Sequence, residues 1–235
     1  MIKTLMVTCG VRWFPICEYW IDQVNFIDKL KIKYFLHGEA LKIAKEYFLK
    51  HDYTHMLVYA EDIITSPDMV KLLLIDAEEY DFPVVSGWMN WGLNRDWVAF
   101  NFKDLSKINV MWSEQYEFQS IDYVLKHDLE NPFVEVFFQG MPLTLIRRDI
   151  VEKLSFKGYK VDYKVLGNKM FYDGSMHDLQ FAIELKQLGI KNIIDLRVFC
   201  FHLGNTVKYA RMDMFGHGEV QFIPAQDSSS ISSSR

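Results

Sequence analysis

The sequence is poor in cysteine, and its three cysteines are scattered. Cys9, Cys17 and Cys200 form no CxxC pair, so we expect neither a zinc site nor a disulfide framework. Such sparse cysteine usage is typical of a reducing compartment. The N-terminal segment MIKTLMVTCG lacks the long apolar region and the small-residue cleavage site of a signal peptide. We therefore expect a cytoplasmic location.

Long apolar runs and an excess of basic charge are also missing. No apolar run approaches the roughly 18 residues of a transmembrane helix. The formal net charge of the 235 residues is -5, which argues against a broad basic face for nucleic acid. We therefore expect no integral membrane segment and no nucleic-acid partner.

The first 90 residues alternate short apolar runs with segments of helical period, and the connections between them are short. Such alternation is typical of a parallel sheet covered by helices, an α/β fold, which binds ligands beyond the carboxyl ends of its strands. The strands that we expect are Leu5–Cys9, Tyr34–Leu36, His55–Tyr59 and Phe82–Ser86. The expected helices are Glu18–Leu30, Glu39–Lys50 and one from Pro67 to about Glu79, with Ser66 as its N-cap.

The second half of the chain is less regular, because residues 88–135 show no clear period. Here we expect short strands at Trp97–Asn101 and Ile108–Trp112. Further on we expect strands at Val134–Phe138 and Ile193–His202, and helices at Arg148–Leu154 and His177–Leu188, the latter ended by Gly189. The sequence shows no internal repeat and no domain-scale linker, which indicates one domain.

Polar side chains occur where several of these elements begin or end. Glu61 and Asp62 follow the strand His55–Tyr59, Asp178 lies in the first turn of a helix, and His202 ends the last strong strand. Each alone has an ordinary structural explanation, such as a solvated turn or a carboxylate stabilised by the helix dipole. Together they are expected to converge on one rim of the sheet, where carboxylates suit a divalent cation that bridges phosphates.

The order of these motifs resembles the nucleotide-sugar glycosyltransferases with the GT-A fold, especially the family 2-like branch. THMLVYAEDIITSPDMVKLLL (54–74) is similar to the strand, acidic metal motif and helix start of that family. YDGSMHDLQFAIELKQLGIKNIIDLRVFCFHLG (172–204) resembles the stretch with the catalytic acidic helix and the metal-binding histidine. Further similarity lies in HGEALKIAKEYFL (37–49), FPVVSGW (82–88) and FFQGMPLTLIRRDIVEKL (137–154), and 172–204 is the most specific of the five segments.

The resemblance covers roughly residues 3–204 and implies a domain plan. Residues 1–204 would form a single GT-A, Rossmann-like domain, in which helices flank a central, mostly parallel sheet beside a smaller, irregular acceptor-side region. Residues 205–225 would form a C-terminal lid or extension. The Ser-rich residues 226–235 are expected to be a disordered tail.

The resemblance also implies a role for each matching residue. Asp62 and His202 would bind Mn²⁺ or Mg²⁺ on the donor diphosphate, and Asp178 would be the general base of inverting transfer. Ala60 departs from the family, because it takes the place of the first acid of the DxD motif. The residues expected along the nucleotide or its phosphates are Thr8, Cys9, Gly10, Lys45 and Glu61.

The implied function is metal-dependent transfer of a sugar from a nucleotide-diphosphate donor to a hydroxyl of a glycan, lipid or protein acceptor. Inversion is favoured because the sequence shows one candidate base and no second nucleophile. One alternative is a non-catalytic nucleotide-sugar or glycan-binding protein, which Ala60 favours. The other is a nucleotidyltransferase, which is disfavoured because the loop CGVRWFP after the first strand is neither glycine-rich nor basic.

Aromatic residues are abundant, at 15% of the chain. Most of those on or beside the expected strands should belong to the core. Trp88, Trp91 and Trp97 instead lie close together in WMNWGLNRDW. Because sugar rings stack on aromatic faces, this group is either an acceptor platform or the packing of an irregular lobe.

Overall fold

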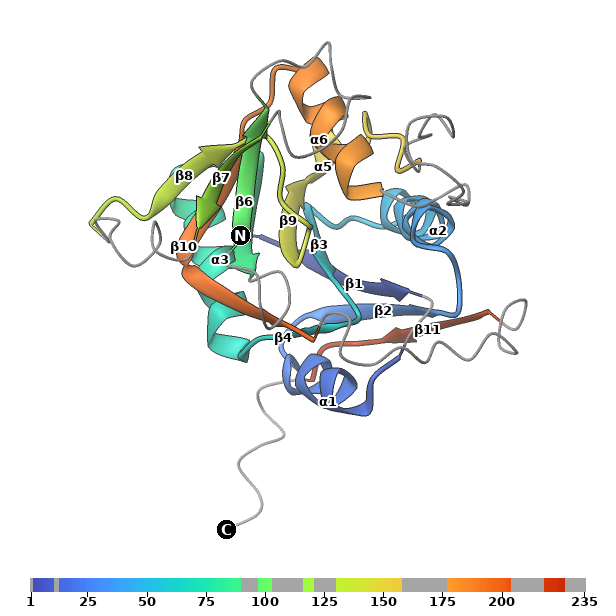
Figure 1. Ribbon diagram of the computed structural model, residues 1–235. Helices are drawn as coiled ribbons and strands as arrows, with labels where there is room; N and C mark the ends of the chain where they lie inside the picture. Colours follow the sequence, from blue (N-terminus) through green and yellow to red (C-terminus); the bar gives the residue numbers. More distant parts are fainter. Residues whose placement is uncertain are drawn as a thin grey trace, which may run out of the picture.

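The structure is a computed structural model, and its described part comprises residues 2–10, 13–89, 97–102, 116–120, 130–157, 177–203 and 218–226. Figure 1 shows a central sheet with helices on both of its faces. Nine strands of the described chain form this sheet, and two more form a small separate sheet.

The central sheet is mixed, and its largest strands run parallel. The order of its main path is β11-β2-β1-β3-β9-β5-β10-β4, and β8 also pairs with β10. β1 is parallel to both β2 and β3, and β5 is parallel to β10, whereas β9 runs antiparallel between β3 and β5. The strands are β1 (Thr4–Gly10), β2 (Asp28–Lys33), β3 (His55–Tyr59), β4 (Ile63–Ile64), β5 (Val84–Met89), β8 (Phe133–Val136), β9 (Leu143–Arg147), β10 (Asn192–His202) and β11 (Glu219–Ile223).

Helices cover the two faces of the sheet with two hydrophobic clusters. The helices are α1 (Pro15–Gln23), α2 (His37–Leu49), α3 (Pro67–Tyr80), α5 (Arg148–Val151) and α6 (His177–Gln187). Side chains of α2, α5 and α6 share one cluster with Leu5 and Val7 of β1, whereas α1 and α3 share the other with Met6. Because successive side chains of a strand point to opposite faces, β1 contributes to both layers. The predicted α/β class is therefore confirmed.

The sequence prediction was wrong between residues 18 and 36. The helix expected to reach Leu30 ends at Gln23, and the strand expected at Tyr34–Leu36 is β2 instead. β2 reads DKLKIK, and its Lys31 is only 3% exposed. The Lys31 ammonium lies 3.1 Å from Glu18 Oε1 and 2.7 Å from Asp22 Oδ1 of α1. A buried charge needs such partners, and α1 supplies them to the strand.

Two predicted ends of helices are confirmed. The Ser66 hydroxyl accepts a hydrogen bond from the Met69 amide (3.4 Å) at the start of α3. Gly189 follows α6 with φ of +69°, a left-handed conformation that favours glycine at this position. Among the described helices, none is both long enough and apolar enough to cross a membrane.

Further predictions concern the strands and a tryptophan after residue 87. β9 was not predicted, and it lies in the centre of the sheet. The small sheet pairs β6 (Trp97–Phe102) with β7 (Tyr116–Ser120), which confirms the expected strand at Trp97, whereas the strand expected at Ile108–Trp112 lies outside the described residues. Trp88 is buried, and its indole N–H donates to the Leu196 carbonyl (2.7 Å), so it is a core residue rather than an acceptor platform.

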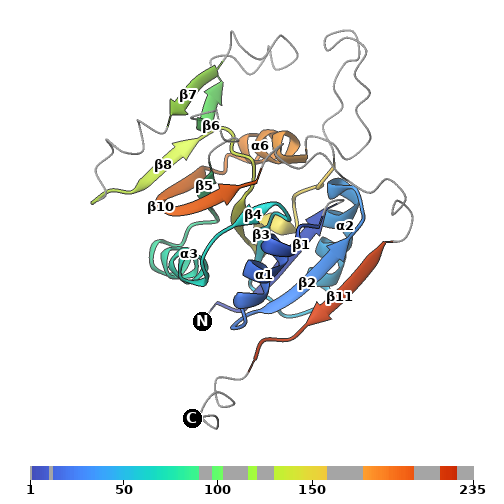
Figure 2. The same ribbon diagram turned by 60° about the horizontal axis from the view of Figure 1, so that its bottom comes forward.

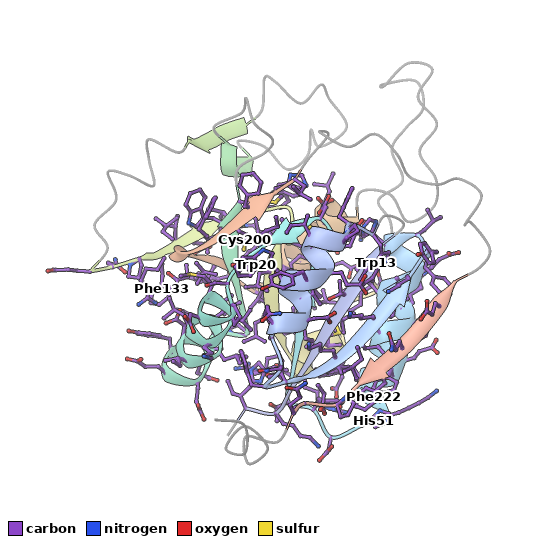
Figure 3. All side chains as sticks on the ribbon, turned by 90° about the horizontal axis from the view of Figure 1, so that it is seen from below. Trp13, Trp20, His51, Phe133, Cys200 and Phe222 are labelled. Atoms are coloured by element: carbon purple, nitrogen blue, oxygen red, sulfur yellow. The ribbon has the colours of Figure 1, made fainter. Side chains whose placement is uncertain are left out.

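The C-terminal segment contributes an edge strand. β11 pairs antiparallel with β2, and Figure 2 shows it along that edge of the sheet. Its Phe222 packs on Tyr47 of α2, whose ring also stacks on His51, and Figure 3 shows Phe222 and His51 close together. The described part of the expected lid or extension is thus an extension of the sheet. Residues 204–217 and the predicted tail from 227 lie outside the described part.

Candidate functional site

The carboxyl ends of the strands and the beginnings of two helices meet around a cavity of about 210 Å³. β1, β3, β5 and β10 contribute residues at or just beyond their carboxyl ends, and α2 and α6 contribute their first residues. This is the edge at which open α/β sheets bind ligands. The lining residues are Cys9, His37, Val58, Ala60, Glu61, Asp62, Met89, Phe138, Gly140, Met141, His177, Asp178 and His202.

Asp62 and His202 form a contact at one side of this cavity. The short strand β4 follows Asp62 and pairs with the end of β10, with Ile63 opposite His202. The Leu203 amide also donates to the Asp62 carbonyl (3.0 Å). These backbone bonds place Asp62 Oδ2 3.1 Å from His202 Nε2. Both side chains are mostly buried, so the pair is held in a fixed geometry.

The pair suits a divalent cation that has further ligands from its substrate. Within the described part of the chain, no group of three or more His, Cys, Asp or Glu side chains could hold a metal ion on its own. Mg²⁺, however, is commonly bound by one or two carboxylates together with substrate phosphates and water. Imidazole nitrogen and carboxylate oxygen are both ordinary ligands of divalent metals. The donor set therefore fits a metal shared between the protein and a diphosphate.

Asp178 lines the same cavity from the first turn of α6. Its Oδ1 accepts a hydrogen bond from the Leu179 amide (2.8 Å). Burial raises the pKa of the Asp178 carboxyl above its usual range, and the hydrogen bond from Leu179 opposes this rise. A carboxylate with a raised pKa is a stronger base than an exposed one. The convergence of Asp62, Asp178 and His202 on one rim, which the sequence predicted, is thus observed.

Glu61, which was predicted to lie along the nucleotide or its phosphates, forms a group in the cavity wall with two histidines, and this group was not predicted. Glu61 Oε2 lies 2.9 Å from His37 Nε2. The ring of His37 stacks on that of His177, with centroids 4.7 Å apart and planes 7° from parallel. Burial, and then the neighbouring His37, lower the pKa of His177 well below its usual value. The sequence signal for this group was faint: each histidine begins a helix, and His177 precedes the predicted base.

Three further predicted residues, all on β1, lie in the cavity wall or next to it. Cys9 lines the cavity, and burial together with Glu61 raises the pKa of its thiol. The position that a Cβ of Gly10 would occupy is filled by the Glu61 carboxylate. Thr8 is buried within β1, one residue before the lining Cys9.

Lys45 does not belong to the site, contrary to the prediction. Its ammonium donates to the carbonyls of Glu152 (2.9 Å) and Leu154 (2.7 Å). Lys45 therefore ties α2 to the segment after α5. The resemblance placed Lys45 on a helix, and that helix is α2. The side chain, however, contacts these two carbonyls instead of a ligand in the cavity.

Comparison with known proteins gives a likeness of fold at low identity. No family model and no curated protein sequence matches the chain. A solved structure of A197 from STIV is similar over 82% of this chain and 81% of its own, with 17% identity and a TM-score of 0.49. The CMP:2-keto-3-deoxy-manno-octonic acid synthetase complexed with CTP is similar over 82% of this chain and 88% of its own, with 10% identity and a TM-score of 0.39. These two likenesses concern the fold alone.

Proposed function

We propose that the protein is a metal-dependent glycosyltransferase that moves a sugar from a nucleotide-diphosphate donor to a hydroxyl acceptor. The observation that carries this proposal is the meeting of Asp62, His202 and Asp178 in one cavity. At about 210 Å³, the cavity is smaller than the roughly 300–1,000 Å³ pockets that enclose drug-sized ligands. Its described walls suit the diphosphate and sugar of a donor rather than the whole molecule.

The charge of the cavity supports the need for a cation. Glu61, Asp62 and Asp178 line it, whereas none of its described lining residues is lysine or arginine. A diphosphate would be repelled by these carboxylates unless a cation lay between them. In the proposal, Asp62 and His202 hold Mn²⁺ or Mg²⁺, which when bound would stabilise the negative charge that develops on the leaving diphosphate.

Asp178 would activate the acceptor. A sugar or alcohol hydroxyl is a poor nucleophile, so a positioned base must take its proton as the new bond forms. The raised pKa of Asp178 suits this task. Glu61, the other carboxylate outside the metal pair, is turned to His37 and is 1% exposed. With one available base among the described lining residues and direct displacement, the anomeric configuration of the sugar inverts.

A second candidate is a protein that binds nucleotide sugars without transferring them. Ala60 favours it, because a methyl group lines the cavity where the resembled family has its first acid. The two candidates share donor binding and differ in turnover.

Donor binding can be tested by thermal unfolding of the full chain with a panel of UDP-, GDP- and dTDP-sugars, each with and without Mn²⁺. A ligand at 100 times its Kd stabilises the folded state by about 2.7 kcal/mol, which raises Tm by several degrees in a chain of this size. We expect one nucleotide class to raise Tm, and to do so only with Mn²⁺. The proposal would be contradicted if no donor raised Tm, or if the rise were the same after EDTA treatment.

A further inference from the structure

Three side chains connect the wall of the cavity to Asp178, and the proposed chemistry gives them no role. Glu61 follows β3, His37 begins α2, and His177 begins α6 next to Asp178. We infer that Glu61, His37 and His177 form a latch that fixes the position of the Asp178 carboxylate. They are then positioning residues, and Glu61 in particular is not a donor ligand. The inference rests on the proposed function for the role of Asp178, but the latch can be tested without turnover.

The first link of the latch is the hydrogen bond between Glu61 and His37. His37 Nε2 lies 2.9 Å from Glu61 Oε2, which is within hydrogen-bonding distance. This bond fixes the orientation of the imidazole ring. On its other side the Glu61 carboxylate fills the space beside Gly10, where any larger residue would displace it. Glu61 is thus held between β1 and α2.

The second link is the stack of the two imidazole rings. The rings lie nearly parallel, and their centroids are 4.7 Å apart. Because the pKa of His177 is lowered well below its usual value by burial and by His37, His177 is neutral near pH 7. Two imidazolium rings would repel each other, whereas a neutral His177 presents a π face to His37 without that penalty. The stack therefore joins the first residues of α2 and α6 directly.

The third link is covalent, since Asp178 follows His177 in the first turn of α6. The Leu179 amide donates to Asp178 Oδ1 over 2.8 Å, so the carboxylate moves with this turn. A displacement of about 1 Å at a reacting group can cost roughly 10²-fold in rate. Loss of the latch should therefore lower kcat and leave donor affinity nearly unchanged.

Variants of His37 and Glu61 separate the links. His37→Gln keeps a donor for Glu61 and removes the ring, whereas His37→Phe keeps a ring and removes the hydrogen bond. Glu61→Gln keeps the shape of the side chain and removes its charge. The matched control is His51→Gln, which removes a histidine stacked on Tyr47 (centroids 4.2 Å apart) beyond the other end of α2.

NMR of the ligand-free protein tests the latch directly. The Leu179 amide signal reports on the Asp178 carboxylate that accepts its hydrogen bond, and the ring signals of His177 report on the stack. We expect the Leu179 amide signal and the His177 ring signals to shift in His37→Gln relative to the wild-type protein and to shift less in His37→Phe. In His51→Gln we expect these signals to remain unchanged. Unchanged signals in His37→Gln would overturn the latch. If that variant does not fold, the same comparison is made with His37→Phe and Glu61→Gln, which are each expected to shift the Leu179 signal.

Kinetics on a donor that the wild-type protein turns over give a second readout. We expect His37→Gln to lower kcat by roughly 10–100-fold with the KM for the donor nearly unchanged, and His37→Phe to recover part of that loss. A raised KM with unchanged kcat would make His37 a donor ligand and overturn the inference. If the wild-type protein turns over no donor of the panel, the proposed function fails while the NMR comparison still decides the latch.

Discussion

At the scale of single residues, the contact between Asp62 and His202 is the basis of the proposed metal site. The two residues are 140 positions apart in the sequence, yet Oδ2 and Nε2 are 3.1 Å apart. The pairing of β4 with β10 determines this distance. The described lining of the cavity contains no lysine or arginine, so in the proposed function this pair holds the cation.

The replacement His202→Ala tests this pair. It removes one of the two ligands proposed among the described residues. Loss of a group that contacts only a metal ligand already costs about 10–100-fold in metal affinity. We therefore expect Mn²⁺-dependent binding of UDP or another matching nucleotide to weaken by at least about tenfold. Isothermal titration with the nucleotide at fixed Mn²⁺ measures this loss. His51→Ala, which removes an exposed histidine, is the control. An unchanged dependence on Mn²⁺ in His202→Ala would remove His202 from the site.

The sequence could predict that Asp62, Asp178 and His202 meet at one edge of the sheet, because each occupies a recognisable place at the beginning or end of an element. It misplaced Lys45, because a motif gives the helix on which a side chain lies and not its partner. Packing decides that partner, here the carbonyls of Glu152 and Leu154. The stack of His37 on His177 could not be predicted from the faint signal that each histidine begins a helix, since it joins two elements that are distant in the chain.

At the scale of elements, two buried ion clusters join helices to strands. One is the set of lysines on β2 that pair with α1. The other ties α3 to β10: Arg197 lies 2.7 Å from Asp76 Oδ1 and 3.0 Å from Asp195 Oδ1. Both of these carboxylates are buried, so one arginine serves two acids.

This second cluster predicts a pH dependence of stability. Burial and the neighbouring Asp195 raise the pKa of Asp76 to about 7, whereas an unfolded aspartate titrates near ~3.9. Between these values the folded state holds a proton that the unfolded chain has lost. The free energy of unfolding should therefore fall as the pH rises from about 4 to about 7.

Urea unfolding of the wild-type protein and of Asp76→Asn at several pH values measures this effect. Asparagine does not titrate, so we expect a smaller slope of stability against pH in the variant. Asp81→Asn, at the exposed C-cap of the same helix, should keep the wild-type slope. Equal slopes in all three proteins would show that Asp76 does not hold its proton in the folded state.

Strands with a simple apolar pattern were predictable, and those that depend on partners were not. HMLVY has five buried residues and forms β3 at the predicted bounds. β2 alternates lysine with apolar residues, so its burial depends on Glu18 and Asp22. β11 is mostly exposed, with Val220 49% and Phe222 43% accessible, and forms by pairing with the edge of β2.

At the scale of the whole molecule, the topology explains why the candidate site lies where it does. β1, β3, β5 and β10 point the same way in the sheet, so their carboxyl ends meet at one edge. The first residues of α2 and α6 are brought to the same edge. The class of the fold, and the edge of the sheet at which the candidate site lies, followed from the alternation of strands and helices. The insertion of β9 between β3 and β5 could not be predicted in this way, because order within a sheet depends on contacts between distant segments.

The most direct test of the central claim compares the wild-type protein with Asp178→Asn. Both are incubated with a donor that raises Tm, with Mn²⁺ and with candidate acceptors, while nucleoside diphosphate release and donor binding are measured. Asp68→Asn, an exposed first-turn aspartate of α3, is the control. The account predicts that Asp178→Asn loses transfer by at least about 10²–10⁴-fold and still binds the donor. Transfer at the wild-type rate, or loss of donor binding together with transfer, would contradict it.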